Sequence, residues 1–289
     1  MSAHGGDVQV IAVPYDSSHR ERRMGAGPTH LVAAGLVDRL RETGRQVALR
    51  ELAPTEGSWV AEIGTAFDLD RQLATAIAEA RARGAFPLVL AGNYITSVGV
   101  IGGLSGATTG VLWFDAHGDF NTPETTVGGF LDGMALATLV GRCWTSLAAG
   151  VPGFAPVAEE NVVLVGARDL DPAEAALLTA SGVVHLRPEE AEARLDAELE
   201  RLGRRVDRLY VHVDLDVLDG SEGRANGYSG GRGLSRAALL DAIGMVGRRC
   251  RVAAGAITAY DPAYDDDGAV ARTAIEAALA LSTAATGSA

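Results

Sequence analysis

Short apolar runs alternate with longer amphipathic stretches along this sequence. Several runs are continuous and rich in β-branched residues, which is typical of strands buried on both faces of a sheet. The runs cover residues 8–13, 46–52, 87–90, 110–114, 162–165, 183–186, 209–213 and 252–258. Helical periodicity marks stretches between them, for example 28–43, 67–83, 188–202, 235–247 and 268–282. This alternation predicts an α/β fold in which helices wrap a parallel sheet.

The composition is that of one large domain. The chain has 289 residues, 47% of them hydrophobic, so residues 1–289 suffice for a single extended core. We find no internal repeat and no long low-complexity linker. No apolar run reaches the roughly 18 residues that span a bilayer, and the N-terminus lacks the features of a signal peptide. Cys143 and Cys250 have no metal-binding spacing, so we interpret both as reduced core residues of a cytoplasmic protein.

The charged residues exclude several classes of function. The formal net charge is −12, which argues against nucleic acid and anionic membranes as main partners. All 25 basic residues are arginine. Without lysine, the chain has neither the Schiff-base residue of pyridoxal phosphate enzymes nor the lysine of a P-loop. Two large groups of α/β enzymes are thereby excluded.

One apolar strand ends in three polar residues at alternate positions, Asp115, His117 and Asp119. Alternate side chains of an extended chain share one face at a spacing of roughly 6.6 Å. The three could therefore converge on one cation, or on two cations roughly 3.5–4 Å apart. The alternative interpretation is a polar strand end with solvated carboxylates and a capping aspartate.

A second apolar strand carries Asp214 and Asp216, again at alternate positions. An unpaired buried carboxylate is costly, so two together indicate a cation between them. The alternative is a surface turn with Asp219 at its tip. His212 shares the face of Asp214 but lies deeper in the strand, and we interpret it as a core histidine rather than a ligand.

Taken together, the two clusters supply four aspartates and one imidazole. Oxygen-rich ligation with a single histidine favours Mn²⁺ over Zn²⁺. Two divalent ions held by shared carboxylates can lower the pKa of a bridging water and polarise a substrate. The Gly-rich segments 127–133 and 220–233 are interpreted as loops over this site, because open α/β sheets bind ligands at the carboxyl ends of their strands.

At this point the sequence resembles the arginase (ureohydrolase) family. Residues 115–123 (Asp-Ala-His-Gly-Asp-Phe-Asn-Thr-Pro) and 214–219 (Asp-Leu-Asp-Val-Leu-Asp) are similar to its two metal motifs. Residues 27–29 resemble its opening helix, and 166–172 its segment that recognises a substrate α-amino group. The resemblance implies a three-layer αβα fold with a single parallel eight-stranded sheet. It also implies a homo-oligomer, either a trimer or a hexamer.

The resemblance also implies a set of metal ligands. Metal A would be held by Asp115, Asp119 and Asp214. Metal B would be held by Asp115, His117, Asp214 and Asp216. The implied cofactor is Mn²⁺, with two ions expected and one ion as the alternative.

Substrate contacts follow from the same motifs. Asn121 would contact a substrate carboxylate, and Asp171, together with Glu174 through water, an α-amino group. A turn amide for Asn121 and a helix cap for Asp171 are the structural alternatives. Asp119 and Asp132 are the candidate catalytic residues, the second because it stands where arginases have a histidine that shuttles protons.

Several positions depart from the family pattern. The family's Gly-Gly-Asp-His-Ser is replaced by residues 91–95 (Ala-Gly-Asn-Tyr-Ile), so Tyr94 stands where a histidine binds metal A. Asp132 has an ordinary pKa near 4, which suits a proton shuttle less well at neutral pH. Residues 257–262 lack the glutamate that binds a guanidinium, for which Asp261 or the acidic run 265–267 could compensate.

The leading hypothesis is a Mn-dependent hydrolase in which metal-bound hydroxide attacks a guanidino or hydroxyguanidino carbon and a C–N bond breaks. Residues 115–126 are especially similar to the branch of the family that hydrolyses Nω-hydroxy-arginine in D-cycloserine biosynthesis. A second hypothesis is a mononuclear enzyme that uses metal B alone and resembles the related deacetylases. A third is a homologue that binds a ligand but has lost turnover. The partner would be a small guanidino compound.

Overall fold

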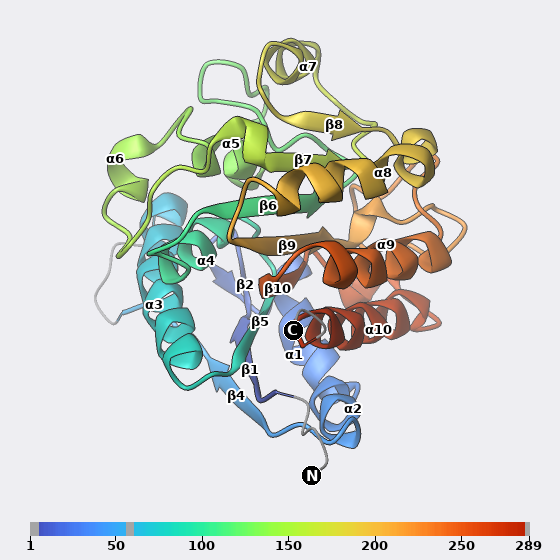
Figure 1. Cartoon of the computed structure of the whole chain (residues 1–289). Helices are drawn as coiled ribbons and strands as arrows, with labels where there is room; N and C mark the ends of the chain where they lie inside the picture. Colours follow the sequence, from blue (N-terminus) through green and yellow to red (C-terminus); the bar gives the residue numbers. More distant parts are fainter. Residues whose placement is uncertain (1–5, 56–60, 287–289) are drawn as a thin grey trace.

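An eight-stranded sheet, parallel throughout, forms the middle layer of the molecule (Figure 1). The computed structural model describes residues 6–55 and 61–286. The strand order is β4-β1-β5-β10-β9-β6-β7-β8, and a small antiparallel pair, β2 and β3, follows β1. The strands are β1 (Val8–Val13), β2 (Tyr15–Asp16), β3 (His19–Arg20), β4 (Val47–Glu51), β5 (Phe86–Ala91), β6 (Thr109–Phe114), β7 (Val162–Val165), β8 (Val184–Leu186), β9 (Arg208–Asp214) and β10 (Val252–Thr258). Each of the eight apolar runs is therefore a strand of the large sheet, as predicted.

Helices cover both faces of this sheet and complete a three-layer fold (Figure 1). The α-helices are α1 (Gly27–Ala33), α2 (Leu36–Glu42), α3 (Glu62–Ala82), α4 (Ser97–Gly103), α5 (Ala135–Leu139), α6 (Thr145–Ala148), α7 (Pro172–Thr179), α8 (Pro188–Gly203), α9 (Arg236–Arg249) and α10 (Ala269–Ala284). Short 3-10 helices cover Arg23–Ala26, Asp132–Met134, Glu159–Asn161, Leu215–Val217 and Pro262–Tyr264. One core contains α1, α2, α8, α9 and α10, and the other contains α3, α4 and α5.

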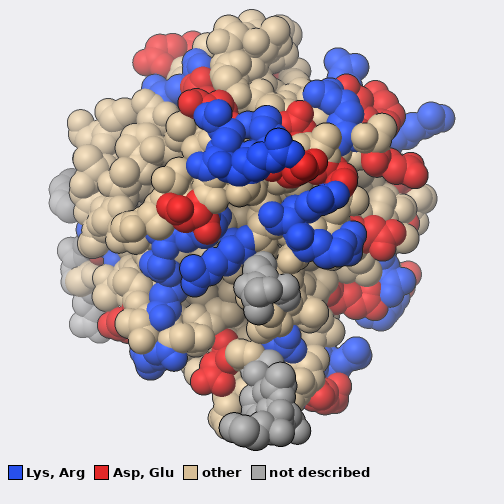
Figure 2. All heavy atoms as spheres, viewed as in Figure 1, with Lys and Arg blue, Asp and Glu red and all other residues tan. Residues whose placement is uncertain are grey.

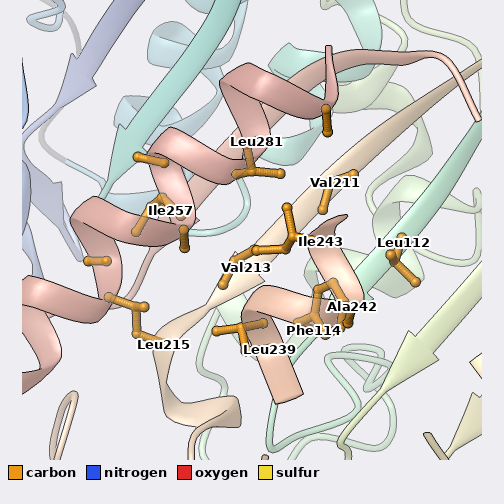
Figure 3. Close-up of a cluster of buried hydrophobic side chains, with 14 of the residues drawn as sticks. Leu112, Phe114, Val211, Val213, Leu215, Leu239, Ala242, Ile243, Ile257 and Leu281 are labelled. Atoms are coloured by element: carbon orange, nitrogen blue, oxygen red, sulfur yellow. The ribbon is translucent and has the colours of Figure 1, made fainter. Parts of the chain in front are cut away.

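The continuous apolar strands are explained by these two cores. Leu112 and Phe114 of β6 point into one core, and Val111 and Trp113 point into the other, because successive side chains alternate across a sheet. Figure 3 shows the first core, where Ile243 of α9 packs over β9. Each fully buried Leu or Phe side chain contributes about 1.5–3 kcal/mol. Both faces of the central strands are therefore hydrophobic.

The helical predictions need two corrections. The pattern at 28–43 predicts one helix, but the chain forms two, because Gly35 has a φ of 94° and interrupts the α-helix. The buried helix α4 was not predicted, since its Gly-rich, β-branched sequence has low helix propensity. A Cβ on Gly103 would lie 2.6 Å from the Cβ of Ile77, so glycine permits α4 to pack closely on α3. Among the described helices, none is long and apolar enough to cross a membrane.

Parallel strands place their carboxyl ends at one edge of the sheet. The loops after β5, β6, β7, β9 and β10 therefore meet there. Strands β6 and β9 are direct neighbours, with Phe114 paired to Val213. The polar residues that follow these two strands are consequently brought together.

Candidate metal centre

The first cluster begins where β6 ends, with the buried Asp115. Its Oδ2 accepts a hydrogen bond from Nε1 of Trp113 at 3.1 Å, and its Oδ1 accepts one from the backbone N–H of His117 at 2.8 Å. Asp119 is 1% exposed and has a φ of 48°, a left-handed conformation that aspartate adopts more readily than most residues. A Cβ on Gly118 would lie 2.7 Å from Oε1 of Glu174 and 2.7 Å from Cδ2 of Leu170, so any larger residue would displace these side chains.

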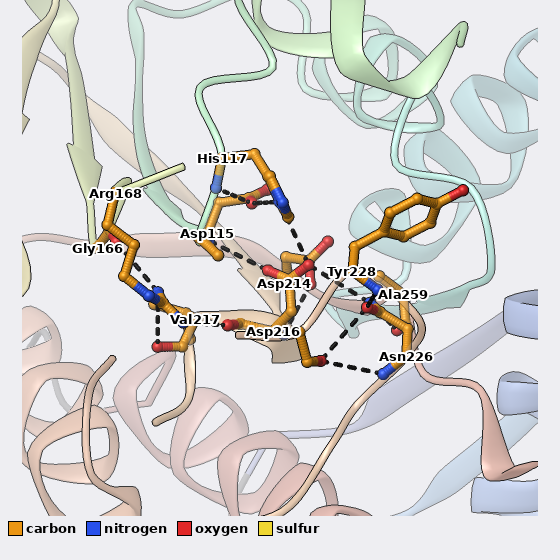
Figure 4. A network of polar contacts seen from close by, with 12 residues as sticks. Asp115, His117, Gly166, Arg168, Asp214, Asp216, Val217, Asn226, Tyr228 and Ala259 are labelled. Carbon is orange, nitrogen blue, oxygen red and sulfur yellow. Dashed lines mark hydrogen bonds and ion pairs between the residues drawn. The ribbon is translucent and has the colours of Figure 1, made fainter. Parts of the chain in front are cut away.

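The second cluster lies directly against the first (Figure 4). The backbone N–H of Asp216 donates to Oδ1 of Asp214 at 2.8 Å, and the N–H of Ala116 donates to Oδ1 of Asp216 at 3.1 Å. Nδ1 of His117 lies 3.3 Å from Oδ1 of Asp115 and 3.3 Å from Oδ2 of Asp216. The two strand ends thus bring their side chains to a common centre.

The donor atoms fit divalent cations. Ligand atoms of Asp115, His117 and Asp216 all lie within 4.8 Å of one another. Oδ2 of Asp119 and Oδ2 of Asp214 are buried, and neither has a hydrogen-bond partner among the described residues. Buried carboxylate oxygens without partners are costly unless a cation or a proton satisfies them. Four carboxylates and one imidazole form a donor set that suits Mn²⁺.

The pKa values of the buried aspartates also indicate a cation site. Burial, followed by the neighbouring carboxylates, raises the pKa of Asp119 and of Asp214 well above the usual range, and it also raises the pKa of Asp115. Burial acts in the same direction on Asp216, but the charge and hydrogen bond of His117 outweigh it and lower the pKa to about 2. Without a cation, the cluster therefore retains protons that a metal would displace.

The imidazole of His117 is strongly perturbed by the same neighbours. Burial favours its neutral form, but the carboxylates of Asp216 and Asp115 outweigh burial and raise its pKa to about 12. In the metal-free protein the ring is therefore a cation paired with two carboxylates. A metal ligand must be the neutral ring, so metal binding would release this proton.

A pocket of about 260 Å³ opens above this centre. Its walls include Tyr94, Asn121 and Asp171 beside His117 and Asp119. The rings of Phe130 and Tyr228 lie 5.7 Å apart at its border. These two rings come from segments 127–133 and 220–233, so both segments lie over the site as predicted.

The proposed substrate contacts line the same pocket. Asn121 is 7% exposed, and its Oδ1 accepts a hydrogen bond from the Thr125 hydroxyl at 3.0 Å. Asp171 is the N-cap residue of α7. Glu174 accepts from the backbone N–H of Phe120 at 2.9 Å and of Asp171 at 3.3 Å, so it joins the start of α7 to the first metal motif. Asp171 and Glu174 therefore cap the start of α7 and also line the pocket.

His212 lies in the core, as its position in the strand predicts. It is fully buried and stacks on Trp113 with ring centroids 3.6 Å apart. Its ring nitrogens contact the hydroxyls of Tyr210 at 2.8 Å and Thr258 at 3.1 Å. Burial lowers its pKa to about 3, so the ring is neutral. Cys143 and Cys250 are likewise buried, and neither forms a disulfide among the described residues.

Two positioning residues were missed in the sequence. Asn226 is buried and donates from Nδ2 to the carbonyl of Ala259 at 2.9 Å and to Oδ2 of Asp216 at 3.4 Å. Arg168 donates to the carbonyls of Asp216 at 3.0 Å and Gly230 at 2.7 Å, and also to those of Val217 and Leu218 (Figure 4). The signal was weak because both residues lie in loops without periodicity.

Replacing Arg168 by methionine is expected to destabilise the protein by about 2–4 kcal/mol, because several backbone carbonyls lose their charged donor. The free energy of unfolding in urea checks this. Arg232→Met, at an exposed arginine of segment 220–233, which Arg168 contacts through Gly230, is the control and should change stability by less than about 0.5 kcal/mol. Equal effects of the two substitutions would contradict a stabilising role for the hydrogen bonds of Arg168.

Comparisons with known proteins agree with this geometry. The model of the Arginase family matches residues 6–284. The chain belongs to the arginase family. It is 28% identical to the arginase of Bacillus subtilis (strain 168) over 283 residues, which cover 93% of this chain and 95% of that protein. It is 31% identical to the arginase of Brevibacillus brevis over 231 residues, 74% of this chain and 76% of that protein.

Solved structures of the arginase family share the whole fold. The crystal structure of arginase from Bacillus cereus superposes with a TM-score of 0.85 at 28% identity, and covers 95% of this chain and 98% of that one. The structure of formimidoylglutamase from Bacillus subtilis has a TM-score of 0.73 at 20% identity, which shows the fold alone. The predicted three-layer fold is therefore confirmed.

The positions at which the sequence predicts departures from the family pattern lie at or beside the centre. Tyr94 is 4% exposed and lines the pocket. Burial, then the carboxylates of Asp119 and Asp214, raises the pKa of its hydroxyl well above 10, so the phenol stays protonated. Ala259, in the segment that lacks the glutamate, is buried with a φ of 60°.

Asp132 lies behind the Tyr94 segment. Its Oδ2 accepts from Nδ2 of Asn93 at 2.6 Å, and its Oδ1 accepts from the backbone N–H of Ile95 at 3.0 Å. Burial raises its pKa to about 7. Asp132 therefore holds the segment that carries Tyr94, whatever its part in proton transfer.

The acidic run at 265–267 does not line the pocket above the metal centre. Asp265 accepts hydrogen bonds from the Tyr260 hydroxyl at 2.8 Å and from the backbone N–H of Ala271 at 2.8 Å. It therefore caps the start of α10. Asp261 lines a separate pocket of about 280 Å³ with Asp16, on the other side of Tyr228.

Proposed function

We propose that this arginase-family protein hydrolyses a C–N bond of a guanidino or hydroxyguanidino compound with an amino-acid-like tail. Membership of the family supports metal-dependent hydrolysis of guanidino substrates in general. The observation that carries the proposal is a pair of buried carboxylate oxygens, on Asp119 and Asp214, that have no hydrogen-bond partner among the described residues. Asp119 lines the open pocket. Bound divalent cations would supply an acidified water and polarise the substrate.

The protein's own residues orient the substrate. Asn121 and Asp171 lie at the pocket wall, where they would bind the carboxylate and the amino group of the tail. Glu174 would assist through a water. Phe130 and Tyr228 would cover the reacting group and exclude bulk water. Binding energy from the tail thus places the guanidino carbon over the metal centre.

Proton transfer is assigned to Asp119 and Asp132. Asp119 lines the pocket at the centre, where its carboxylate would accept a proton from the acidified water. Asp132, with a pKa of about 7, titrates in the range where a general acid or base is most effective. Its contact with Asn93 links it to the segment that carries Tyr94.

Two Mn²⁺ ions are proposed, in the sets that the sequence implies. One ion would be held by Asp115, Asp119 and Asp214. The other would be held by Asp115, His117, Asp214 and Asp216, of which Asp115, His117 and Asp216 have ligand atoms within 4.8 Å of one another. A single ion in that group is the alternative, because Tyr94 replaces a histidine ligand of the first ion. Metal content per chain distinguishes two bound ions from one.

We also propose that the protein forms a homo-oligomer, either a trimer or a hexamer. Analytical ultracentrifugation would test this.

The test is urea or hydroxyurea release from arginine, Nω-hydroxyarginine or agmatine in the presence of Mn²⁺. Turnover of any one of them supports the proposal. Binding of Mn²⁺ without turnover of any guanidino compound would instead support a homologue that has lost catalysis. Deacylation of an amide with one metal per chain would support the mononuclear hypothesis.

Replacing Asn121 by alanine is expected to raise KM about tenfold for a substrate with an α-carboxylate, which corresponds to about 1.4 kcal/mol. The reason is loss of one hydrogen bond to a charged group. The same variant should leave KM for agmatine, which has no carboxylate, nearly unchanged. Steady-state kinetics with the two substrates measure this, and an equal rise for both would contradict a carboxylate contact.

A further inference from the structure

A pocket of about 210 Å³ lies at the opposite edge of the sheet, where β5, β9 and β10 begin. Three arginines from separate elements line it: Arg81 of α3, Arg208 of β9, and Arg251, which precedes β10. Strand β9 has seven residues and rises roughly 3.3 Å per residue, so about 20 Å separates this pocket from the metal centre. The two sites therefore share no residue.

Arginine side chains gather on this part of the surface. Figure 2 shows them across the middle of the face, near the ends of α8 and α9, and every blue residue is arginine because the chain has no lysine. The last turns of these two helices contribute Arg201, Arg248 and Arg249. Arg201 and Arg249 are paired with Glu198 and Asp196, so these helix ends add arginine side chains near the pocket but little uncompensated charge.

The three arginines of the pocket have no counter-ion in the described part of the chain. No carboxylate of residues 6–55 or 61–286 lies within 4.0 Å of their guanidinium groups, although Asp7 is part of the lining. By contrast, Arg142 pairs with a carboxylate at 2.6 Å. Within the described residues, these guanidinium groups form no ion pair, and the nearest acidic influence on Arg208 is the more distant charge of Asp207.

Arg208 is the most constrained of the three. It is 6% exposed, and it donates to the carbonyl of Ser105 at 3.0 Å, to the Thr109 hydroxyl at 3.1 Å and to the carbonyl of Leu104. Arg81 donates to the carbonyl of Gly103 at 2.9 Å. These carbonyls, at the end of α4, carry only partial negative charge.

Three convergent guanidinium groups repel one another. Burial, followed by the charge of Arg251, lowers the pKa of Arg81. Burial, followed by the charges of both other arginines, lowers the pKa of Arg208, and the opposing charge of Asp207 does not outweigh them. Arg208 is buried, and buried charges are normally paired, so an anion beside the three arginines would supply the missing partner. An oxyanion would satisfy the guanidinium forks, which match carboxylate and phosphate oxygens.

We propose that the pocket of Arg81, Arg208 and Arg251 binds a compact oxyanion that carries two negative charges, a phosphate or a dicarboxylate. Its volume of about 210 Å³ admits a small anion rather than a nucleotide. Binding would stabilise the fold, because it removes the repulsion at the point where β5, β9 and β10 start. This site is independent of the function proposed for the metal centre.

Calorimetry on dialysed, metal-free protein tests the proposal with inorganic phosphate and with succinate, each against chloride at equal ionic strength. Saturable binding of either anion is expected, and the comparison identifies which chemistry the site prefers. A Tm that rises by several degrees at saturation should accompany it.

The decisive variant is Arg251→Gln, because Arg251 is exposed and its loss should not unfold the chain. It should weaken anion binding about tenfold or more. Arg187→Gln, at an exposed arginine at the start of α8, is the matched control and should bind like the unmodified protein. The proposal is wrong if neither anion binds saturably, or if both variants bind equally well.

Discussion

Asp214→Asn is expected to abolish metal binding and to lower kcat/KM by about 1,000-fold or more. Asp214 belongs to both proposed ligand sets. Its Oδ1 already accepts the backbone N–H of Asp216 at 2.8 Å, and its buried Oδ2 has no partner among the described residues. Asparagine keeps the size and removes the charge, so the loss would come from ligation rather than from packing. Metal content after dialysis and urea release measure the two effects.

The same motif provides the control. Asp219 is the third aspartate of residues 214–219, but its carboxylate accepts from Ser221 and from the backbone of Gly233, away from the centre. Asp219→Asn should therefore keep its metal. Loss of metal from both variants alike, or from neither, would contradict the assigned ligand set. Stability of metal-free Asp214→Asn should equal or exceed that of the unmodified protein at pH 8, since a buried charge is removed.

Removing the metal should make stability fall as the pH rises, which is the second large effect. Asp115, Asp119 and Asp214 have raised pKa values in the folded state, and Asp132 has a pKa of about 7. Between an unfolded pKa near 3.9 and the folded value, such a group is protonated only in the folded chain. Its stabilising contribution is complete below the unfolded pKa and is lost as the pH rises through the folded pKa.

The remaining two groups do not reverse this trend near neutrality. Asp216, with a pKa of about 2, stabilises the fold above its unfolded pKa and loses that contribution only on acidification. His117, with a pKa of about 12, stabilises the fold below its unfolded pKa near 6.5, and its contribution declines through the alkaline range. Between pH 6 and 8 the free energy of unfolding of the metal-free protein should therefore fall by about 1.4 kcal/mol or more per pH unit.

Urea unfolding at pH 6, 7 and 8 measures this trend. The metal-free protein should become less stable at each step. With saturating Mn²⁺ the dependence should weaken or invert, because the metal competes with protons for the same oxygens. A metal-free protein whose stability is constant or rises over this range would show that these carboxylates are not buried together.

The fold was predictable because its strands are buried on both faces. All eight apolar runs form strands, and only the order of the strands in the sheet required the structure. Helices were harder to predict. The break at Gly35 depends on a positive φ, and α4 depends on tertiary burial of a sequence with poor helix propensity.

The meeting of the two clusters was predictable, because both follow strands of one parallel sheet. The extended alternation was not found, since Asp119 follows β6 in a left-handed conformation and Asp216 lies in a 3-10 helix. The residues that position the metal ligands were not predictable from the sequence. Asn226 and Arg168 act through backbone carbonyls and a carboxylate across loop segments that lack periodicity. The contact of Trp113 with Asp115 follows the same two-residue spacing as the ligands, so that one signal was present in the sequence. The arginine pocket at the far edge had no linear motif, because it combines residues from three distant elements.

An anomalous difference map of crystals grown with Mn²⁺ tests the central claim most directly. The account predicts manganese peaks within coordination distance of Asp115, Asp214 and Asp216, with the His117 imidazole facing one of them. Crystals that contain Mn²⁺ but show no peak between the ends of β6 and β9 would contradict it.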